Sequence, residues 1–137
     1  MGELTKRVER ALALLDACRV DEAMEEFHPE ATLVMPGGEA GGRDAIRDVI
    51  AAFAQSFPDA RRELLGAVES GDTIAFEMVV TGTQTGPYPT PGGPPMPPTG
   101  KRVSFRECDV LRFRDGKIVS LHAYFDMANI LAQIGLM

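Results

Sequence analysis

Two turn signals, each flanked by long runs of strand-forming residues, constrain this chain more than any other feature. Asp115-Gly116 joins residues 101–114 to residues 117–125, and Ser70-Gly71-Asp72 joins residues 61–69 to residues 73–83. Asp-Gly is among the strongest short signals for a β-hairpin, because its residues tolerate the positive φ that such turns require. Apolar residues alternate along residues 74–80, as expected for a strand with one buried face. The second half of the chain is therefore predicted to form two antiparallel hairpins.

The first half of the chain favours helices. Residues 3–18 and 43–56 carry apolar side chains at helical spacing, in the first segment Leu4, Val8, Ala11, Leu12 and Leu15. A short helix beginning near Asp21 and a strand at residues 31–35 lie between them. Helices grouped before an antiparallel meander indicate a single α+β domain, with helices packed on one face of the sheet.

Composition excludes several classes of partner. The net charge is −6 and the pI about 4.9, so nucleic acid and anionic membranes are poor partners. No apolar run reaches transmembrane length. Cys18 and Cys108 have no short spacing between them, and only His28 and His122 could add imidazole ligands. We therefore expect a cytoplasmic protein without a metal site, in which the two cysteines are reduced rather than joined in a disulfide.

Most of the ten prolines lie within residues 86–100. Proline cannot donate to a strand ladder, so this segment is predicted to be a loop that arches from one sheet edge over the mouth of a pocket. Gln84 and Tyr88 are candidate ligand contacts from this loop. The alternative for Tyr88 is that it covers the sheet edge.

The last predicted strand, residues 119–125, carries an unusual row of polar side chains. Because side chains alternate along a strand, Ser120, His122, Tyr124 and Asp126 share one face. Groups that donate, accept or titrate are costly to bury unless each finds a partner or a ligand. The row predicts a small-molecule pocket, with Asp126 as the leading candidate for its chemistry.

Pairing the last two strands through Asp115-Gly116 places acids beside this row. Counting back from the turn gives three cross-strand pairs: Asp109 with His122, Glu107 with Tyr124, and Phe105 with Asp126. Asp109, Glu107 and Phe105 are therefore candidate substrate contacts. A slip of one residue would remove all three pairs.

Several segments together resemble a known family. They are Phe27-His-Pro-Glu-Ala31, Gly42-Arg-Asp-Ala-Ile46, Phe57-Pro-Asp59, Thr81-Gly-Thr-Gln-Thr-Gly86, Pro98-Thr-Gly-Lys101, Arg112-Phe-Arg-Asp-Gly-Lys-Ile118, Tyr124-Phe-Asp126 and Leu131-Ala-Gln-Ile-Gly135. In order and spacing, the chain resembles the SnoaL-like polyketide cyclases of the nuclear-transport-factor-two-like superfamily, which includes ketosteroid isomerase. The resemblance implies one SnoaL-like domain over residues 1–137. Its fold would be a cone-shaped α+β barrel, in which a curved mixed or antiparallel sheet wraps the N-terminal helices around an apolar cavity, ending in a short C-terminal helix, usually as a homodimer.

The resemblance also matches Asp126 to the catalytic acid–base aspartate of these cyclases. An apolar cavity beside Phe105 would disfavour the charged form of this carboxyl, which suits a base that takes a proton next to a carbonyl. The alternative is that Asp126 caps a helix beginning at Met127. The two roles can coexist.

The neighbouring candidates each have a catalytic and a structural interpretation. His122, held in one tautomer by Asp109, is either the acid–base partner or half of a buried pair that fixes the register. Tyr124 either donates to a developing enolate oxygen or bonds Glu107 with its ring in the core. Phe53, on the predicted helix, is either a substrate contact or a core residue.

The sequence is compatible with three functions. The first is a cofactor-independent enzyme, a polyketide or ester cyclase or an isomerase, in which Asp126 removes a proton from a hydrophobic substrate. The second is a non-catalytic module that binds a ligand or dimerises. The third, epoxide hydrolysis, requires an Asp–Arg–Asp relay and ranks lower, because Arg106 and Arg112 fall on the opposite face. Separately, Arg61-Arg62 is interpreted as a solvated strand end rather than as an anion site.

Overall fold

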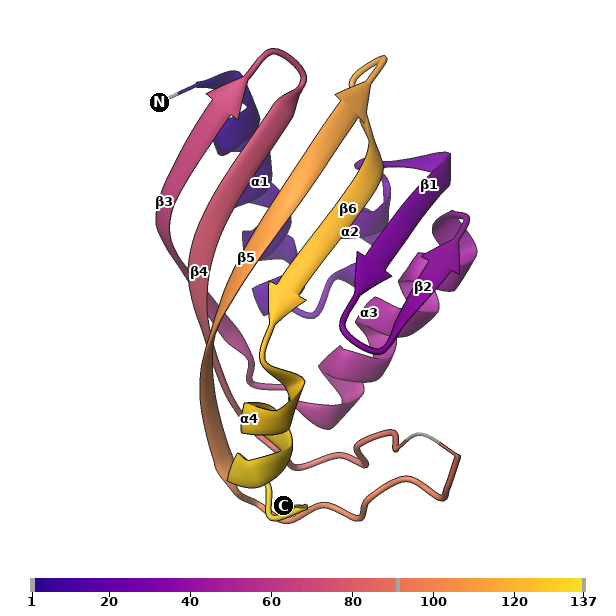
Figure 1. Cartoon of the computed structure of the whole chain (residues 1–137), viewed down its shortest axis with the longest axis vertical. Coiled ribbons are helices and arrows are strands. Elements are labelled where there is room, and N and C mark those ends of the chain that lie inside the picture. Colours follow the sequence, from indigo (N-terminus) through magenta and orange to yellow (C-terminus); the bar gives the residue numbers. More distant parts are fainter. Residues whose placement is uncertain (1, 91, 137) are drawn as a thin grey trace.

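The computed structural model describes residues 2–90 and 92–136 as one curved, six-stranded sheet with helices on one face (Figure 1). The elements in chain order are α1 (Glu3–Asp16), α2 (Val20–Met24), β1 (Phe27–Met35), β2 (Gly38–Gly41), α3 (Arg43–Ser56), β3 (Arg61–Ser70), β4 (Thr73–Thr83), β5 (Arg102–Arg114), β6 (Lys117–Phe125) and α4 (Met127–Gln133). None of the helices in these ranges combines the length and the apolar composition needed to cross a bilayer.

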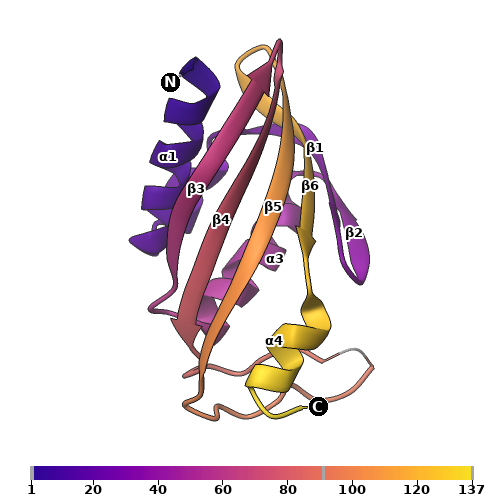
Figure 2. The same ribbon diagram turned by 60° about the vertical axis from the view of Figure 1, so that its left-hand side comes forward.

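The sheet has the order β2-β1-β6-β5-β4-β3. All neighbouring strands are antiparallel except β1 and β6, which run parallel. Figure 2 shows α1 beside β3, and α4 at the end of the sheet opposite the β5–β6 turn. The predicted α+β fold, with a curved mixed sheet, N-terminal helices and a short C-terminal helix, is confirmed.

Both predicted hairpins are present, and the β5–β6 turn has the expected geometry. Asp115 has a φ of 53° and Gly116 a φ of 77°, so both central residues take the positive φ that this turn needs. Along β4 the side chains at 74, 76, 78 and 80 are at most 4% exposed, which confirms the alternation. These side chains pack on the helices and form the centre of the core.

The first half differs from prediction in its boundaries. The first helix ends at Asp16 rather than at residue 18, and β1 begins at Phe27 rather than at residue 31. The short strand β2 was not predicted at all, because its sequence, Gly-Glu-Ala-Gly, contains no β-branched or aromatic residue. It forms because β1 supplies a ladder for it to pair with.

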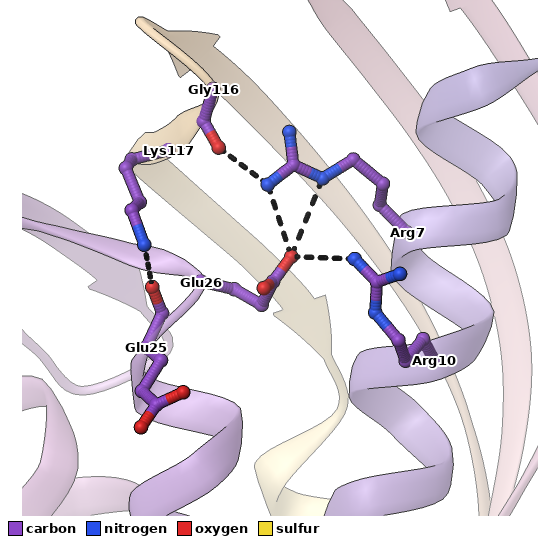
Figure 3. A network of polar contacts seen from close by, with 6 residues as sticks. All are labelled: Arg7, Arg10, Glu25, Glu26, Gly116 and Lys117. Atoms are coloured by element: carbon purple, nitrogen blue, oxygen red, sulfur yellow. Dashed lines mark hydrogen bonds and ion pairs between the residues drawn. The ribbon is translucent and has the colours of Figure 1, made fainter.

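A polar network closes the end of the molecule at the β5–β6 turn (Figure 3). Arg7 of α1 lies 3.2 Å from the Glu26 carboxylate and also donates to the Gly116 carbonyl. Lys117 donates to the Glu25 carbonyl. These contacts join α1, the segment between α2 and β1, and the hairpin turn, so they fix the first helix against the far end of the sheet.

At the opposite end, Gln84 anchors the proline-rich loop. Its side chain is fully buried, and its amide nitrogen donates to the carbonyls of Gly86 at 2.9 Å and Pro97 at 3.2 Å. Its amide oxygen accepts from the Thr99 backbone at 3.0 Å and from the Thr99 hydroxyl. Both amide hydrogens and both oxygen lone pairs are thus occupied. The loop itself thus uses the hydrogen-bonding capacity of Gln84, and contact of this residue with a ligand stays a prediction.

Tyr88 packs inward from the same loop. Its ring meets Phe57 edge-on with centroids 6.0 Å apart, and its backbone pairs with Met96. Burial raises the pKa of its phenol. The loop is therefore attached to the end of α3 through an aromatic contact as well as through Gln84. Whether Tyr88 also contacts a ligand stays a prediction.

We expect Gln84→Leu to release the loop while leaving the sheet intact. Leucine has a similar size but leaves the carbonyls of Gly86 and Pro97 without their donors, which should lower the free energy of unfolding by about 3 kcal/mol. Urea denaturation and limited proteolysis within residues 86–100 would measure both effects. Gln55→Leu, on the exposed side of α3, is the matched control and should change neither.

Candidate active site

The pairing of β5 with β6 departs from prediction by one residue. Arg114–Lys117 and Phe113–Ile118 pair as expected, but the register then shifts so that Arg112 lies opposite Ser120. Val119 is the additional residue between these pairs, as in a β-bulge, which puts two residues of one strand opposite one of the other.

The bulge changes every pair beyond it. Asp109 lies opposite Ala123, Glu107 opposite Phe125, and Val110 opposite His122. The predicted pairs of Asp109 with His122, Glu107 with Tyr124, and Phe105 with Asp126 are therefore wrong. A count from the turn could not include an unpaired residue within the strand.

The shift also separates the predicted polar row from the acids of β5. Ala123 and Phe125 share the inner face with Asp109 and Glu107, whereas Tyr124 lies opposite Cys108 and is 56% exposed. The prediction that the imidazole, phenol and carboxyl groups at the end of β6 point into one hollow is wrong, because Tyr124 lies on the outer face, which no helix covers (Figure 2).

Asp126 is an exposed residue at the start of α4. Its backbone is extended, and its Oδ1 accepts from the Asn129 backbone N–H at 3.1 Å. This is the geometry of a helix N-cap. The capping interpretation of Asp126 is confirmed, and its catalytic role stays a prediction.

Two acids on the inner face of β5 are the main feature that the sequence did not place correctly. Asp109 is 6% exposed, and Glu107 is half-buried. On the strands beside Asp109 stand Phe76 and Ala123. The two carboxyl groups are close enough for each to shift the pKa of the other. Sequence alternation alone contained the signal, since residues 103, 105, 107, 109 and 111 fall on one face.

The pair is arranged to hold a proton. Burial raises the pKa of Asp109 well above its usual range, and the neighbouring charge of Glu107 raises it further. Burial also raises the pKa of Glu107, while the hydrogen bond from Asp109 and the charge of Arg62 oppose that rise. These directions make Asp109 the member of the pair that holds a proton more strongly.

One oxygen of this pair is left without a partner. Asp109 Oδ1 is buried and has no hydrogen bond within residues 2–90 and 92–136. A buried polar atom without a partner costs about 1–3 kcal/mol. Such a cost is expected where an acid serves a ligand rather than the fold, so this oxygen points to a functional site.

Arg62 brings a positive charge to the same inner face. Its side chain is 9% exposed, and its Nη1 lies 2.9 Å from Asp16 Oδ1. Its guanidinium carbon lies 5.6 Å from the centre of the Phe53 ring. The interpretation of Arg61-Arg62 as a solvated strand end is correct for Arg61 and wrong for Arg62, because adjacent strand residues point to opposite faces.

Aromatic side chains fill the space next to the acids. Phe53 of α3 packs against Phe57 with centroids 5.0 Å apart and against Phe105 at 6.3 Å. Phe105 in turn packs against Phe125 at 5.9 Å. Phe105 is a core residue on the same inner face as Glu107, and Phe53 is a partly buried residue packed against that core. The partner of Glu107 on β6 is Phe125.

The described residues form hollows on the surface beside the helices. One, of about 470 Å³, lies between α1 and β3, and one of about 240 Å³ lies between α2 and α3. Neither is lined by Glu107, Asp109 or Asp126. The described residues contain no group of three or more His, Cys, Asp or Glu side chains arranged to hold a metal ion.

We expect Asp109→Asn to stabilise the protein above neutral pH. Folding raises the pKa of Asp109, so its contribution to stability is fully present below the unfolded pKa, near 3.9, and is lost as pH rises through the folded pKa. Each pH unit of that rise corresponds to about 1.4 kcal/mol. Asparagine stays neutral at every pH and can still donate to Glu107.

Urea denaturation at pH 5 and pH 8 would measure this difference. The gain in the free energy of unfolding should be larger at pH 8. Asp48→Asn, at an exposed site on α3, is the control and should show no such gain. A loss of stability at both pH values would show that Asp109 is not buried as an acid.

Comparison with protein families matches residues 8–121 to the SnoaL-like domain. Comparison with curated proteins finds no match. Among solved structures, the chain is similar to IdmH, a candidate polyketide cyclase from Streptomyces antibioticus, with 25% identity, coverage of 98% of this chain and 99% of that one, and a TM-score of 0.78.

Two further structures share the fold. A candidate SnoaL-like polyketide cyclase from a Jannaschia species has 20% identity, coverage of 97% of this chain and 94% of that one, and a TM-score of 0.80. A protein with a ketosteroid-isomerase-like fold from Catenulispora acidiphila, in complex with trimethylamine, has 22% identity, coverage of 96% and 93%, and a TM-score of 0.76.

Proposed function

The chain belongs to the SnoaL-like domain family, and we propose that it is a cofactor-independent enzyme that moves a proton next to a carbonyl group of a hydrophobic small molecule. The observation that carries this proposal is the buried Glu107–Asp109 pair, in which one carboxyl oxygen has no described partner. Paired acids whose environments push their proton affinities apart are suited to separate acid and base roles.

The two acids have different roles in this proposal, Glu107 as the base and Asp109 as the hydrogen-bond donor. Ionised Glu107 takes a proton from the carbon next to the carbonyl. Protonated Asp109 turns its O–H to the carbonyl oxygen, where the negative charge develops, and stabilises it by a hydrogen bond. Burial raises the pKa of Glu107, which makes it a stronger base than an exposed glutamate and still able to return the proton.

The product depends on the step that follows formation of the enolate. If Glu107 returns the proton to a different carbon, the product is an isomer. If the enolate attacks a second carbonyl of the same molecule, a carbon–carbon bond forms and a ring closes, as in a polyketide cyclase. Phe53, Phe105 and Phe125 give the site an apolar, aromatic border. An apolar cyclic or polyketide-like substrate suits such a surface.

The resemblance to the cyclases assigns the base to Asp126 instead. Asp126 stands where β6 ends and α4 begins, on the strand whose Phe125 borders Glu107. We propose Glu107 as the base because it lies next to a proton donor and is half-buried, whereas Asp126 is an exposed helix cap. The two assignments predict different mutant activities.

We expect Glu107→Gln to reduce proton transfer by about 100-fold or more, since the amide cannot act as a base. Asp126→Asn should keep both the helix cap and the activity, because asparagine caps as well as aspartate. Deuterium incorporation next to the carbonyl of a panel of cyclic ketones and β-keto esters, followed by NMR in D₂O, would measure this.

Each opposite result has a definite meaning. If Asp126→Asn abolishes exchange and Glu107→Gln does not, Asp126 is the base. If the wild-type protein binds these ketones without exchanging their protons, the protein is a non-catalytic binding module.

Epoxide hydrolysis is a second candidate, because Arg62 supplies a buried arginine near two acids. In that reaction water attacks one epoxide carbon, and the ring oxygen takes a proton from Asp109. A cyclic epoxide in ¹⁸O-labelled water should then give a diol with one labelled oxygen. Absence of the diol would remove this candidate.

We further propose a homodimer formed through the outer face of the sheet. Figure 1 shows that face without a covering helix, and Tyr124 exposes 56% of its surface there. Light scattering should find a dimer for the wild type and a monomer for Tyr124→Arg. Ala13→Arg, on the exposed side of α1, should leave the dimer unchanged. A monomeric wild type would refute the proposal.

The cytoplasmic location stays a prediction.

A further inference from the structure

Arg62 is held by residues of two helices. Its backbone N–H donates to Asp16 Oδ2 at 3.2 Å, while its guanidinium donates to Asp16 Oδ1 at 2.9 Å. Phe53 of α3 provides the aromatic face beneath the guanidinium, 5.6 Å away. A cation held by a carboxylate and an aromatic ring has little freedom to move.

The strand register brings this charge near the acid pair. Arg62 pairs with Val80 on β4, and Val80 pairs with Phe105 on β5. Glu107 is the next residue after Phe105 on the same inner face. The charge of Arg62 lowers the pKa of Glu107 and of Asp109, although no direct ion pair joins it to either in the described part of the chain.

The charged groups at this site come from several elements. Asp16 comes from α1 and Arg62 from β3, and Glu107 and Asp109 come from β5. Cys108 lies between the two acids on the opposite face of the strand. The neighbouring strands β4 and β6 and helix α3 present apolar side chains here. Arg62 is therefore the cation whose charge opposes the effect of burial on the pKa of the two acids.

We propose that Arg62 is a positioning residue which, pinned by Asp16 and Phe53, keeps one proton rather than two on the Glu107–Asp109 pair. This inference rests on the acid–base role proposed above. Without the cation, burial would favour two neutral acids and leave no base. With an unpinned arginine, a direct ion pair to Glu107 would form and weaken the base. Asp16 thus holds Arg62 near enough for its charge to affect the two acids, without a direct contact to either of them.

The test is a titration of the carboxyl groups themselves, which needs no substrate. Protein with ¹³C-labelled Asp and Glu side chains would be titrated by NMR, with signals assigned through Glu107→Gln and Asp109→Asn. Arg62→Gln should move the titration of the pair upward, because removal of a nearby positive charge disfavours the ionised carboxylates. Asp16→Asn should move it downward.

Two further variants separate charge from structure. Arg62→Lys keeps the charge and should restore most of the wild-type titration. Arg61→Gln removes the same charge from the outer face of the same strand and should leave the pair unchanged. If Arg62→Gln fails to fold, Asp16→Asn still separates the two roles, because the inference expects a downward shift of the titration and a purely structural role predicts none.

Equal titrations in Arg62→Gln, Asp16→Asn and Arg61→Gln would overturn the inference. The result is independent of whether Glu107 is the base. If the titration shifts as expected but Glu107→Gln keeps full exchange activity, the proposed function fails while the control of the pair by Arg62 stands. If activity depends on Glu107 but the titration does not move, only the role of Arg62 fails.

Discussion

The extra residue at Val119 decides which side chains of the last hairpin meet inside the molecule. It sits close to the β5–β6 turn, so almost all of β6 lies beyond it and is shifted by one position. Because side chains alternate, one added residue exchanges the inner and outer sets. Asp109 and Glu107 consequently face aromatic side chains rather than His122 and Tyr124, and the polar row of β6 faces away from the helices.

Much of the fold could be predicted because its signals are local. The Asp115-Gly116 turn and the alternation of β4 depend only on neighbouring residues, and both are confirmed. The bulge, the strand β2 and the inward position of Arg62 depend on partners distant in the chain. Val119 looks like any other strand residue, and Arg62 looks like a charged strand end until Asp16 lies beside it. The acids were recognised as site residues, but their partners could not be derived from a simple count.

The candidate site joins parts of the chain that have different structural roles. The network of Arg7 and Glu26 fixes α1 at one end of the sheet, and the last residue of that helix, Asp16, holds Arg62. The position of the first helix is therefore linked to the charge near the acids. A helix that looks only structural in sequence thus takes part in the electrostatics of the proposed active site.

The anchor at Gln84 has a consequence for how this scaffold tolerates change. Its amide ties the two stems of the loop together at Gly86 and Thr99, so the tip is separated from the sheet by a closed base. The entropy of closing a loop grows only slowly with its length. Extra residues grafted at Gly92-Gly93 should therefore cost little, which makes this tip a suitable place to attach a tag, a sensor or a second domain.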